Sequence, residues 1–133
     1  MSLSNQVALV TGAGQGIGKA TALALAAAGA NVVAVDINGQ SAKEAAAAVS
    51  AAGPKGLAIQ ADMGSLPDID RMVAETIAAF GKIDILVNNA GVTRRAYIMD
   101  LTEEDWDRIH RVNAKGVFFC LQRVAREMIP RRS

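Results

Sequence analysis

Residues 11–18 read Thr-Gly-Ala-Gly-Gln-Gly-Ile-Gly, and this stretch decides the fold. It follows a short apolar run, residues 7–10, and precedes an alanine-rich segment with helical spacing. Glycines at a strand-to-helix turn allow a tight turn, a close approach of backbone to a pyrophosphate and close packing of the helix on the sheet. The amino end of such a helix offers unpaired N–H groups and a partial positive charge to phosphates. The stretch predicts a nucleotide-binding turn, and the alternative is an ordinary glycine turn.

Short apolar runs alternate with longer helical segments along the whole chain. The runs cover residues 7–10, 31–35, 56–59 and 83–87, and each is continuous in hydrophobicity, as parallel strands buried on both faces tend to be. Helical spacing covers residues 16–28, 41–52, 68–80 and a long region from Thr102 to about Ile129, which Pro130 ends. This alternation predicts an α/β fold, a Rossmann-type doubly wound parallel sheet that stops after its fourth strand and the long helix. We expect one dinucleotide-binding domain over residues 1–133.

Apolar spacing predicts which side of each helix is packed. In the first helix this side carries Ile17, Ala20, Ala24 and Ala27, and in the second Ala42, Ala45, Ala46 and Val49. In the third it carries Ile69, Met72, Val73, Ile77 and Phe80, followed by Gly81 as a C-cap. In the long region the inward residues are Trp106, Ile109, Val117, Leu121, Val124 and Met128. Thr102 and Asp105 have the spacing of a helix-capping signal.

Composition narrows the class of protein further. Of the 133 residues 51% are hydrophobic, and the formal charge is +1, so nothing favours a nucleic-acid partner. The single cysteine, Cys120, excludes an internal disulfide framework and is expected to be buried, and the lone His110 has no second ligand at metal spacing. The amino terminus lacks the pattern of a signal peptide, and no stretch reaches the ~20 apolar residues of a membrane span. We expect a cytoplasmic protein with no membrane partner and no metal.

Asp36 closes the second apolar run, at the distance from the glycine stretch where an acid can accept hydrogen bonds from ribose hydroxyls. A carboxylate there repels a 2′-phosphate, and Ile37 and Asn38 follow with no arginine nearby to bind one. The sequence therefore favours NAD over NADP as the cofactor. The alternative is a solvated aspartate at a strand end.

The order of the motifs resembles that of one known family. The glycine spacing is T-G-x-x-x-G-x-G, through Gly12, Gly16 and Gly18, and it departs from G-x-G-x-x-G. Further landmarks follow in order, namely Asp62-Met63, Asn88-Asn89-Ala90-Gly91 and Asn113. Together they resemble the short-chain dehydrogenase/reductase family, and not its extended, sugar-nucleotide epimerase branch. Within the family, Gly91-Val92-Thr93-Arg94 and Glu104-Asp105-Trp106 are similar to 3-oxoacyl-carrier-protein reductases and polyol dehydrogenases.

The resemblance implies hydride transfer between a nicotinamide cofactor and a ketone or secondary alcohol. Together with the glycine turn and Asp36, it predicts cofactor contacts at Gly12, Gln15, Gly16, Ile17, Gly18, Asp36, Ile37, Asp62, Met63, Asn89, Ala90 and Gly91. It also implies a homo-oligomer, formed in the family through the long helix and a further helix that this sequence lacks.

Several polar residues allow two interpretations. From its neighbours alone, Asn113 is expected to face solvent, whereas the resemblance implies a member of a catalytic tetrad, beside a kink in its helix, that holds a proton-relay water. Asp62 could contact adenine, as the resemblance implies, or cap the helix that follows. One of Asn88 and Asn89 is expected to tie neighbouring loops together by side-chain hydrogen bonds.

The family's reaction also requires a serine and a Tyr-x-x-x-Lys pair downstream of the position of Asn113, in which the lysine lowers the pKa of the tyrosine. The only tyrosine, Tyr97, lies upstream and is followed four residues later by Leu101, and the only later serine is Ser133. We therefore expect an incomplete reductase that is inactive alone. The alternatives are an enzyme completed by a second chain or an extension, a non-catalytic nucleotide-binding or interaction module, and a methyltransferase that uses S-adenosylmethionine.

Overall fold

The computed structural model describes residues 2–132, in which four strands form one parallel sheet in the order β3-β2-β1-β4. The strands are β1 (Val7–Thr11), β2 (Asn31–Asp36), β3 (Gly56–Gln60) and β4 (Ile85–Val87). The α-helices are α1 (Gly16–Ala27), α2 (Gly39–Ala51), α3 (Leu66–Phe80), α4 (Glu103–His110) and α5 (Val117–Met128). Short 3-10 turns, η1 (Ile98–Asp100) and η3 (Ile129–Arg131), and a π-helix, η2 (Arg111–Gly116), complete the chain. The predicted α/β fold is confirmed.

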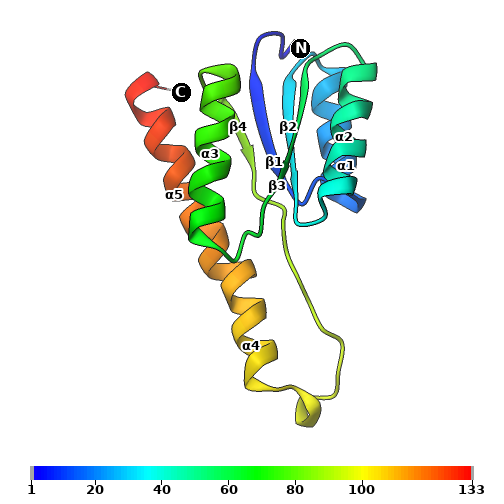
Figure 1. Cartoon of the computed structure of the whole chain (residues 1–133), viewed down its shortest axis with the longest axis vertical. Coiled ribbons are helices and arrows are strands. Elements are labelled where there is room, and N and C mark those ends of the chain that lie inside the picture. The colour runs from blue at the N-terminus through cyan, green and yellow to red at the C-terminus, as the bar shows by residue number, and fades with distance from the viewer. Residues whose placement is uncertain (1, 133) are drawn as a thin grey trace.

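The central strand β1 pairs on one side with β2, where Leu9 lies opposite Val33, and on the other with β4, where Leu9 lies opposite Leu86. Helices α1 and α2 cover one face of the sheet, and α3 and α5 cover the other (Figure 1). The chain runs outward from β1 to β3 and then returns to the far side of β1. This reversal opens a crevice at the carboxyl ends of β1 and β4, where open α/β sheets bind ligands.

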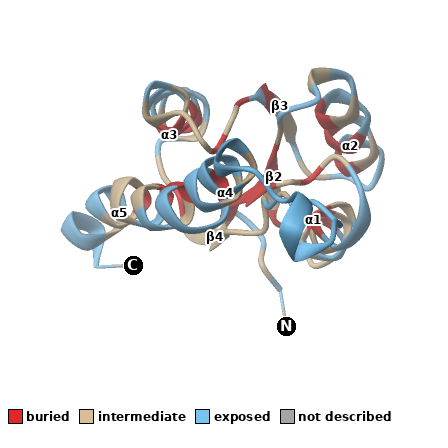
Figure 2. Ribbon diagram, turned by 90° about the horizontal axis from the view of Figure 1, so that it is seen from below, coloured by how far each residue is buried: buried red, intermediate tan, exposed pale blue. Residues whose placement is uncertain are grey.

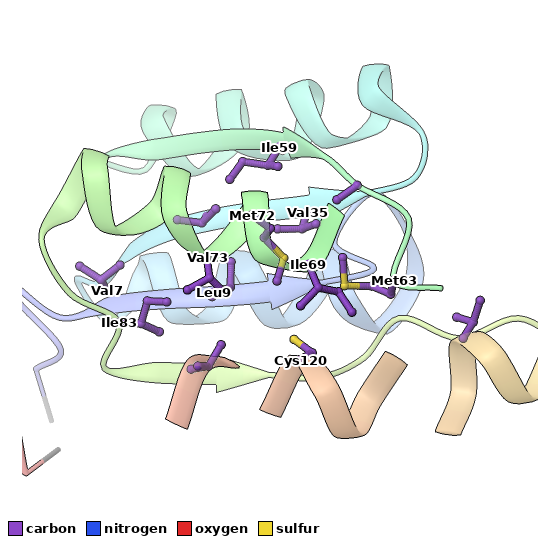
Figure 3. Packing of buried hydrophobic residues seen from close by; sticks show 14 residues of the cluster. Val7, Leu9, Val35, Ile59, Met63, Ile69, Met72, Val73, Ile83 and Cys120 are labelled. Carbon is purple, nitrogen blue, oxygen red and sulfur yellow. The ribbon is translucent and has the colours of Figure 1, made fainter. Parts of the chain in front are cut away.

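The two faces of the sheet are filled differently. The α3–α5 face holds large side chains, among them Leu9, Ile69, Met72 and Ile83, and Cys120 of α5 points into the same layer (Figure 3). The opposite face is filled mostly by alanine and valine, including Ala22, Ala26, Ala45 and Val49. Because these side chains are small, α1 and α2 lie close to the sheet. The burial predicted for α2 is confirmed, and in α3 it is confirmed for Ile69, Met72 and Val73, whereas Ile77 and Phe80 are partly buried.

The packed side of α1 was predicted wrongly. The buried residues are Gly18, Ala22 and Ala26, whereas Ile17 is 79% exposed, and Ala20, Ala24 and Ala27 are also exposed. A Cβ on Gly18 would lie 2.0 Å from the Gly12 carbonyl oxygen, so only glycine fits where the first turn meets the chain leaving β1. That contact sets the rotation of the helix, and Ile17 turns toward the crevice.

The long helix predicted to end near Ile129 is interrupted by η2. Val112, Cys120 and Val124 are buried, but Trp106 is 64% exposed and Leu121 is 56% exposed, so their predicted inward positions are wrong. The π-helix inserts extra backbone and shifts the helical phase between α4 and α5. In addition, α4 extends past the carboxyl edge of the sheet (Figure 1), and its surface there is mostly exposed (Figure 2). The predicted cap at Thr102 is confirmed as a capping box with Asp105.

The amino end of β4 is joined to β1 through Asp84. Its carboxylate accepts a hydrogen bond from the Val7 N–H at 2.8 Å and pairs with Lys82 at 2.9 Å and Arg131 at 3.5 Å. Burial raises the pKa of Asp84, but these hydrogen bonds and positive charges outweigh it, so the pKa lies below its ordinary value. Strand β4 starts at Ile85 and not at the predicted residue 83.

No helix within residues 2–132 is long and apolar enough to cross a membrane.

Candidate functional site

A cleft of about 510 Å³ lies at the carboxyl ends of the strands. It is bounded by the turn after β1, the ends of β2 and β3, and the segment after β4. The broken helix formed by α4, η2 and α5 closes it at the junction of α4 with η2. Eleven of the predicted cofactor contacts line it: Gly12, Gln15, Gly16, Ile17, Asp36, Ile37, Asp62, Met63, Asn89, Ala90 and Gly91. Gly18 lies behind the turn instead, packed against the Gly12 carbonyl. The cleft thus gathers residues from four separate strand ends.

The glycine turn adopts backbone conformations that side chains disfavour. Gly12 has a φ of +65° and Gly16 a φ of +56°. A Cβ on Gly12 would also lie 2.9 Å from the Asn89 amide nitrogen and 3.0 Å from the Ala90 Cα. Glycine at position 12 therefore permits both the turn and the close approach of the segment after β4.

The amino end of α1 is left open. The N-cap residue Gln15 makes no side-chain capping bond, and the first turn carries no acidic residue. By contrast, Asn38 caps α2, Ser65 caps α3 and Thr102 caps α4, each by accepting a backbone N–H. Of these four helices α1 alone presents uncapped N–H groups, and it presents them to the cleft. The helix end can therefore bind an anionic group such as a pyrophosphate.

Asp36 connects the glycine turn to the end of β2. One carboxylate oxygen accepts the Gly14 N–H at 2.8 Å, and the other accepts the Asn38 N–H at 2.9 Å. Each carboxylate oxygen can accept a further hydrogen bond. Asp36 therefore orders two loops and still lines the cleft, so it is more than a solvated aspartate at a strand end.

A buried threonine holds the segment after β4. The Thr11 hydroxyl accepts hydrogen bonds from the backbone N–H groups of Asn89 and Ala90, both at 3.0 Å. The side chain of Asn89 donates to the Gly12 carbonyl at 3.3 Å, and that of Asn88 donates to the Val117 carbonyl at 2.9 Å. The prediction that one asparagine ties loops together is confirmed for Asn89, whereas Asn88 ties its loop to the first residue of α5.

Asp62 and Met63 follow β3. The carboxylate of Asp62 accepts the Gly64 N–H at 2.7 Å, while Ser65 caps α3, so the helix-capping interpretation of Asp62 is wrong. Met63 is buried, and a Cβ on Gly116 would lie 2.0 Å from its carbonyl oxygen. The π-helix is therefore in close contact with this wall of the cleft.

Asn113 lies in η2 and is exposed, and both ends of its amide form hydrogen bonds. Its Oδ1 accepts the Val92 N–H at 2.8 Å, and its Nδ2 donates to the Val92 carbonyl at 2.7 Å. The prediction that Asn113 faces solvent is confirmed, and its side chain also ties η2 to the segment after β4. The resemblance implied a kink beside Asn113, and the structure has a π-helix there; Asn113 is not among the residues that line the cleft.

Six residues line the cleft that the sequence did not indicate. They are Val35, Ala61, Val92, Arg108, Arg111 and Val112. The spacing of Arg108 and Arg111 places them on one side of a helix, which was the only available signal.

Three side chains with reactive groups lie outside the cleft. Tyr97 is 85% exposed, and His110 stacks on the exposed Trp106 with ring centroids 4.0 Å apart. Cys120 is buried as expected, and burial raises the pKa of its thiol to about 11. No group of three or more histidine, cysteine or acidic side chains within residues 2–132 is arranged to hold a metal ion.

Comparison with known proteins gives consistent matches along nearly the whole chain. The sequence model of a family described as short chain dehydrogenase matches residues 6–133. The subunit BbsD of (2S)-[(R)-hydroxy(phenyl)methyl]succinyl-CoA dehydrogenase from Thauera aromatica is 45% identical over 129 residues, which are 97% of this chain and 52% of that protein. The 3-oxoacyl-[acyl-carrier-protein] reductase FabG of Staphylococcus epidermidis is 42% identical over 133 residues, covering 97% of this chain and 53% of its own.

A crystal structure of NAD+-bound xylitol dehydrogenase superposes with a TM-score of 0.93 at 36% sequence identity. The match covers 98% of this chain and 51% of that one. The chain spans about half the length of the relatives it matches.

Proposed function

The chain belongs to the short chain dehydrogenase family, and from this premise we propose that residues 1–133 form the NAD-binding part of an oxidoreductase acting on a ketone or a secondary alcohol. The observation that carries the proposal is the uncapped amino end of α1, which opens into the same cleft as Asp36. A dinucleotide needs a site for its phosphates beside a site for its ribose, and this cleft offers both.

We assign the parts of the cofactor along the edge of the sheet. The pyrophosphate lies over the glycine turn and the first N–H groups of α1. The adenosine ribose lies at Asp36, where a free lone pair can accept its hydroxyls. The nicotinamide lies over Asn89, Ala90 and Gly91, which Thr11 and Asn89 hold close to β1.

We propose NAD in preference to NADP because of the charge at the ribose end. A 2′-phosphate at Asp36 would face a carboxylate, and residues 37–40 read Ile-Asn-Gly-Gln, with no cation to compensate. The bound cofactor supplies the hydride chemistry, and the protein supplies its orientation and surroundings.

We further propose that this chain does not turn over by itself. The sequence contains no Tyr-x-x-x-Lys pair, and the exposed Tyr97 is followed four residues later by Leu101. Asn113 is then the one member of the implied catalytic tetrad that is present, in a positioning role that holds Val92 beside the nicotinamide end. The complete enzyme would be a homo-oligomer in the cytoplasm.

Calorimetric titration of the purified protein tests the proposal, after intact mass has established whether it is the 13.8 kDa chain. We expect saturable NAD binding, weaker NADP binding and no oxidation of secondary alcohols. Asp36→Asn should narrow the difference between NAD and NADP, whereas Glu127→Ala, an exposed acid on α5 that removes the same charge, should leave it unchanged.

Absence of saturable binding, or tighter binding of NADP, would refute the cofactor assignment. Turnover by the 13.8 kDa chain would refute its incompleteness. Binding by the complete natural protein with no activity toward any alcohol or ketone would favour the non-catalytic nucleotide-binding module.

A further inference from the structure

Two arginines lie on the wall of the cleft that the broken helix provides. Arg108 is in α4, and Arg111 begins η2, and both line the cleft. The Nε of Arg111 lies 2.8 Å from the place a Cβ on Gly64 would occupy, so its side chain runs along the backbone that follows β3. Neither arginine forms an ion pair within residues 2–132, so each guanidinium group is available to a ligand.

The strand order shows which part of a dinucleotide this wall meets. The phosphates belong at α1 after β1, and the ribose belongs at Asp36 after β2. Because β3 is the next strand outward, the base belongs over the segment that follows β3. That segment is Asp62, Met63 and Gly64, and Arg111 lies against it.

We propose that Arg111 stacks its guanidinium plane on the adenine ring of the bound dinucleotide, with Arg108 as a second cation on the same rim. This inference rests on the proposed nucleotide-binding function. A planar, weakly hydrated guanidinium stacks on aromatic faces, and adenine offers such a face. Val112, next along the helix and also in the cleft, adds an apolar surface for the ring. The contact makes Arg111 a determinant of affinity for the adenosine half of the ligand.

Titrations with parts of the cofactor separate stacking from simple charge attraction. The ligands are NAD, AMP and nicotinamide mononucleotide, measured with the complete protein and with Arg111→Ala and Arg111→Lys. Arg111→Ala removes the stacking group and should lower the affinity for NAD and for AMP by the same factor, about 5- to 30-fold. Nicotinamide mononucleotide has no adenine, so its affinity should not change. Arg111→Lys keeps the charge and loses the plane, so it should restore little of the affinity.

The control variant is Arg126→Ala, an exposed arginine of α5 that lines a different groove, and it should bind all three ligands normally. Equal urea midpoints for all variants would show that the fold is intact. Full recovery in Arg111→Lys, or normal AMP binding by Arg111→Ala, would overturn the stacking contact and leave the proposed function standing. If the wild-type protein binds neither NAD nor AMP, both proposals are wrong.

Discussion

The hydroxyl of Thr11 should contribute far more to stability than that of the equally buried Thr76. Both side chains are fully buried. Thr11 accepts hydrogen bonds from two backbone N–H groups in the segment after β4, so Thr11→Val leaves two donors unpaired with almost no change in shape. An unpaired buried donor costs about 1–3 kcal/mol. Because water can partly reach these two groups, we expect the free energy of unfolding to fall by about 2–4 kcal/mol.

Thr76 is the matched control for the same substitution. Its hydroxyl donates at 2.8 Å to the carbonyl of Met72, one turn earlier in α3, which the helical ladder already pairs. Thr76→Val therefore leaves no donor or acceptor unpaired and should cost less than about 1 kcal/mol. Urea unfolding followed by circular dichroism measures both values. An equal fall in the free energy of unfolding for the two variants would refute the claim that the two unpaired N–H groups cause the loss. Thr11→Ser keeps the hydroxyl and should retain most of the stability.

Three further predictions concern other parts of the fold. Gly18→Ala should cost about 1–3 kcal/mol or more in urea unfolding, because its Cβ would collide with the Gly12 carbonyl; an unchanged midpoint would contradict this. The pKa of Asp84 is lowered in the folded state. Its ionised carboxylate therefore stabilises the fold above the unfolded pKa of about 4, and this stabilisation is lost as the pH falls through the folded pKa. The stability difference between wild type and Asp84→Asn should therefore be larger at pH 7 than at pH 3, and a constant difference would count against it. Cys120 should react with a thiol reagent at pH 8 only after unfolding in urea, because burial raises its pKa to about 11; fast labelling of native protein would show an exposed thiol.

The sheet and the part of the cleft formed by the strand ends could be predicted because they depend on local chemistry. Parallel strands buried on both faces give continuous apolar runs, and the residues at their carboxyl ends meet at one edge whatever the details of packing. For this reason the glycine turn, Asp36, Asp62 and Asn89 were brought together as expected, although they lie far apart in sequence.

The parts of the cleft formed by α1 and by the junction of α4 with η2 depend on how these helices are rotated. The spacing of apolar residues alone did not determine that rotation. In α1 the rotation is set by the contact between Gly18 and the Gly12 carbonyl, which outweighs the larger apolar side chain of Ile17. In the broken helix the phase depends on η2, and nothing in Arg-Val-Asn-Ala-Lys-Gly distinguishes a π-helix from an α-helix by composition. Arg108 and Arg111 were therefore missed as residues of the site.

The π-helix also makes the length of residues 111–116 a property of the cleft. A π-helix holds one more residue in its turn than an α-helix, so if the same six residues formed a regular α-helix, the preceding helix would turn relative to the following one by about 100°. Since α5 is fixed by Cys120 and Val124 in the core, α4 would rotate, and Arg108 would leave the cleft wall. A relative with one residue fewer in this segment and a regular α-helix would therefore present the same side of α4 above the glycine turn.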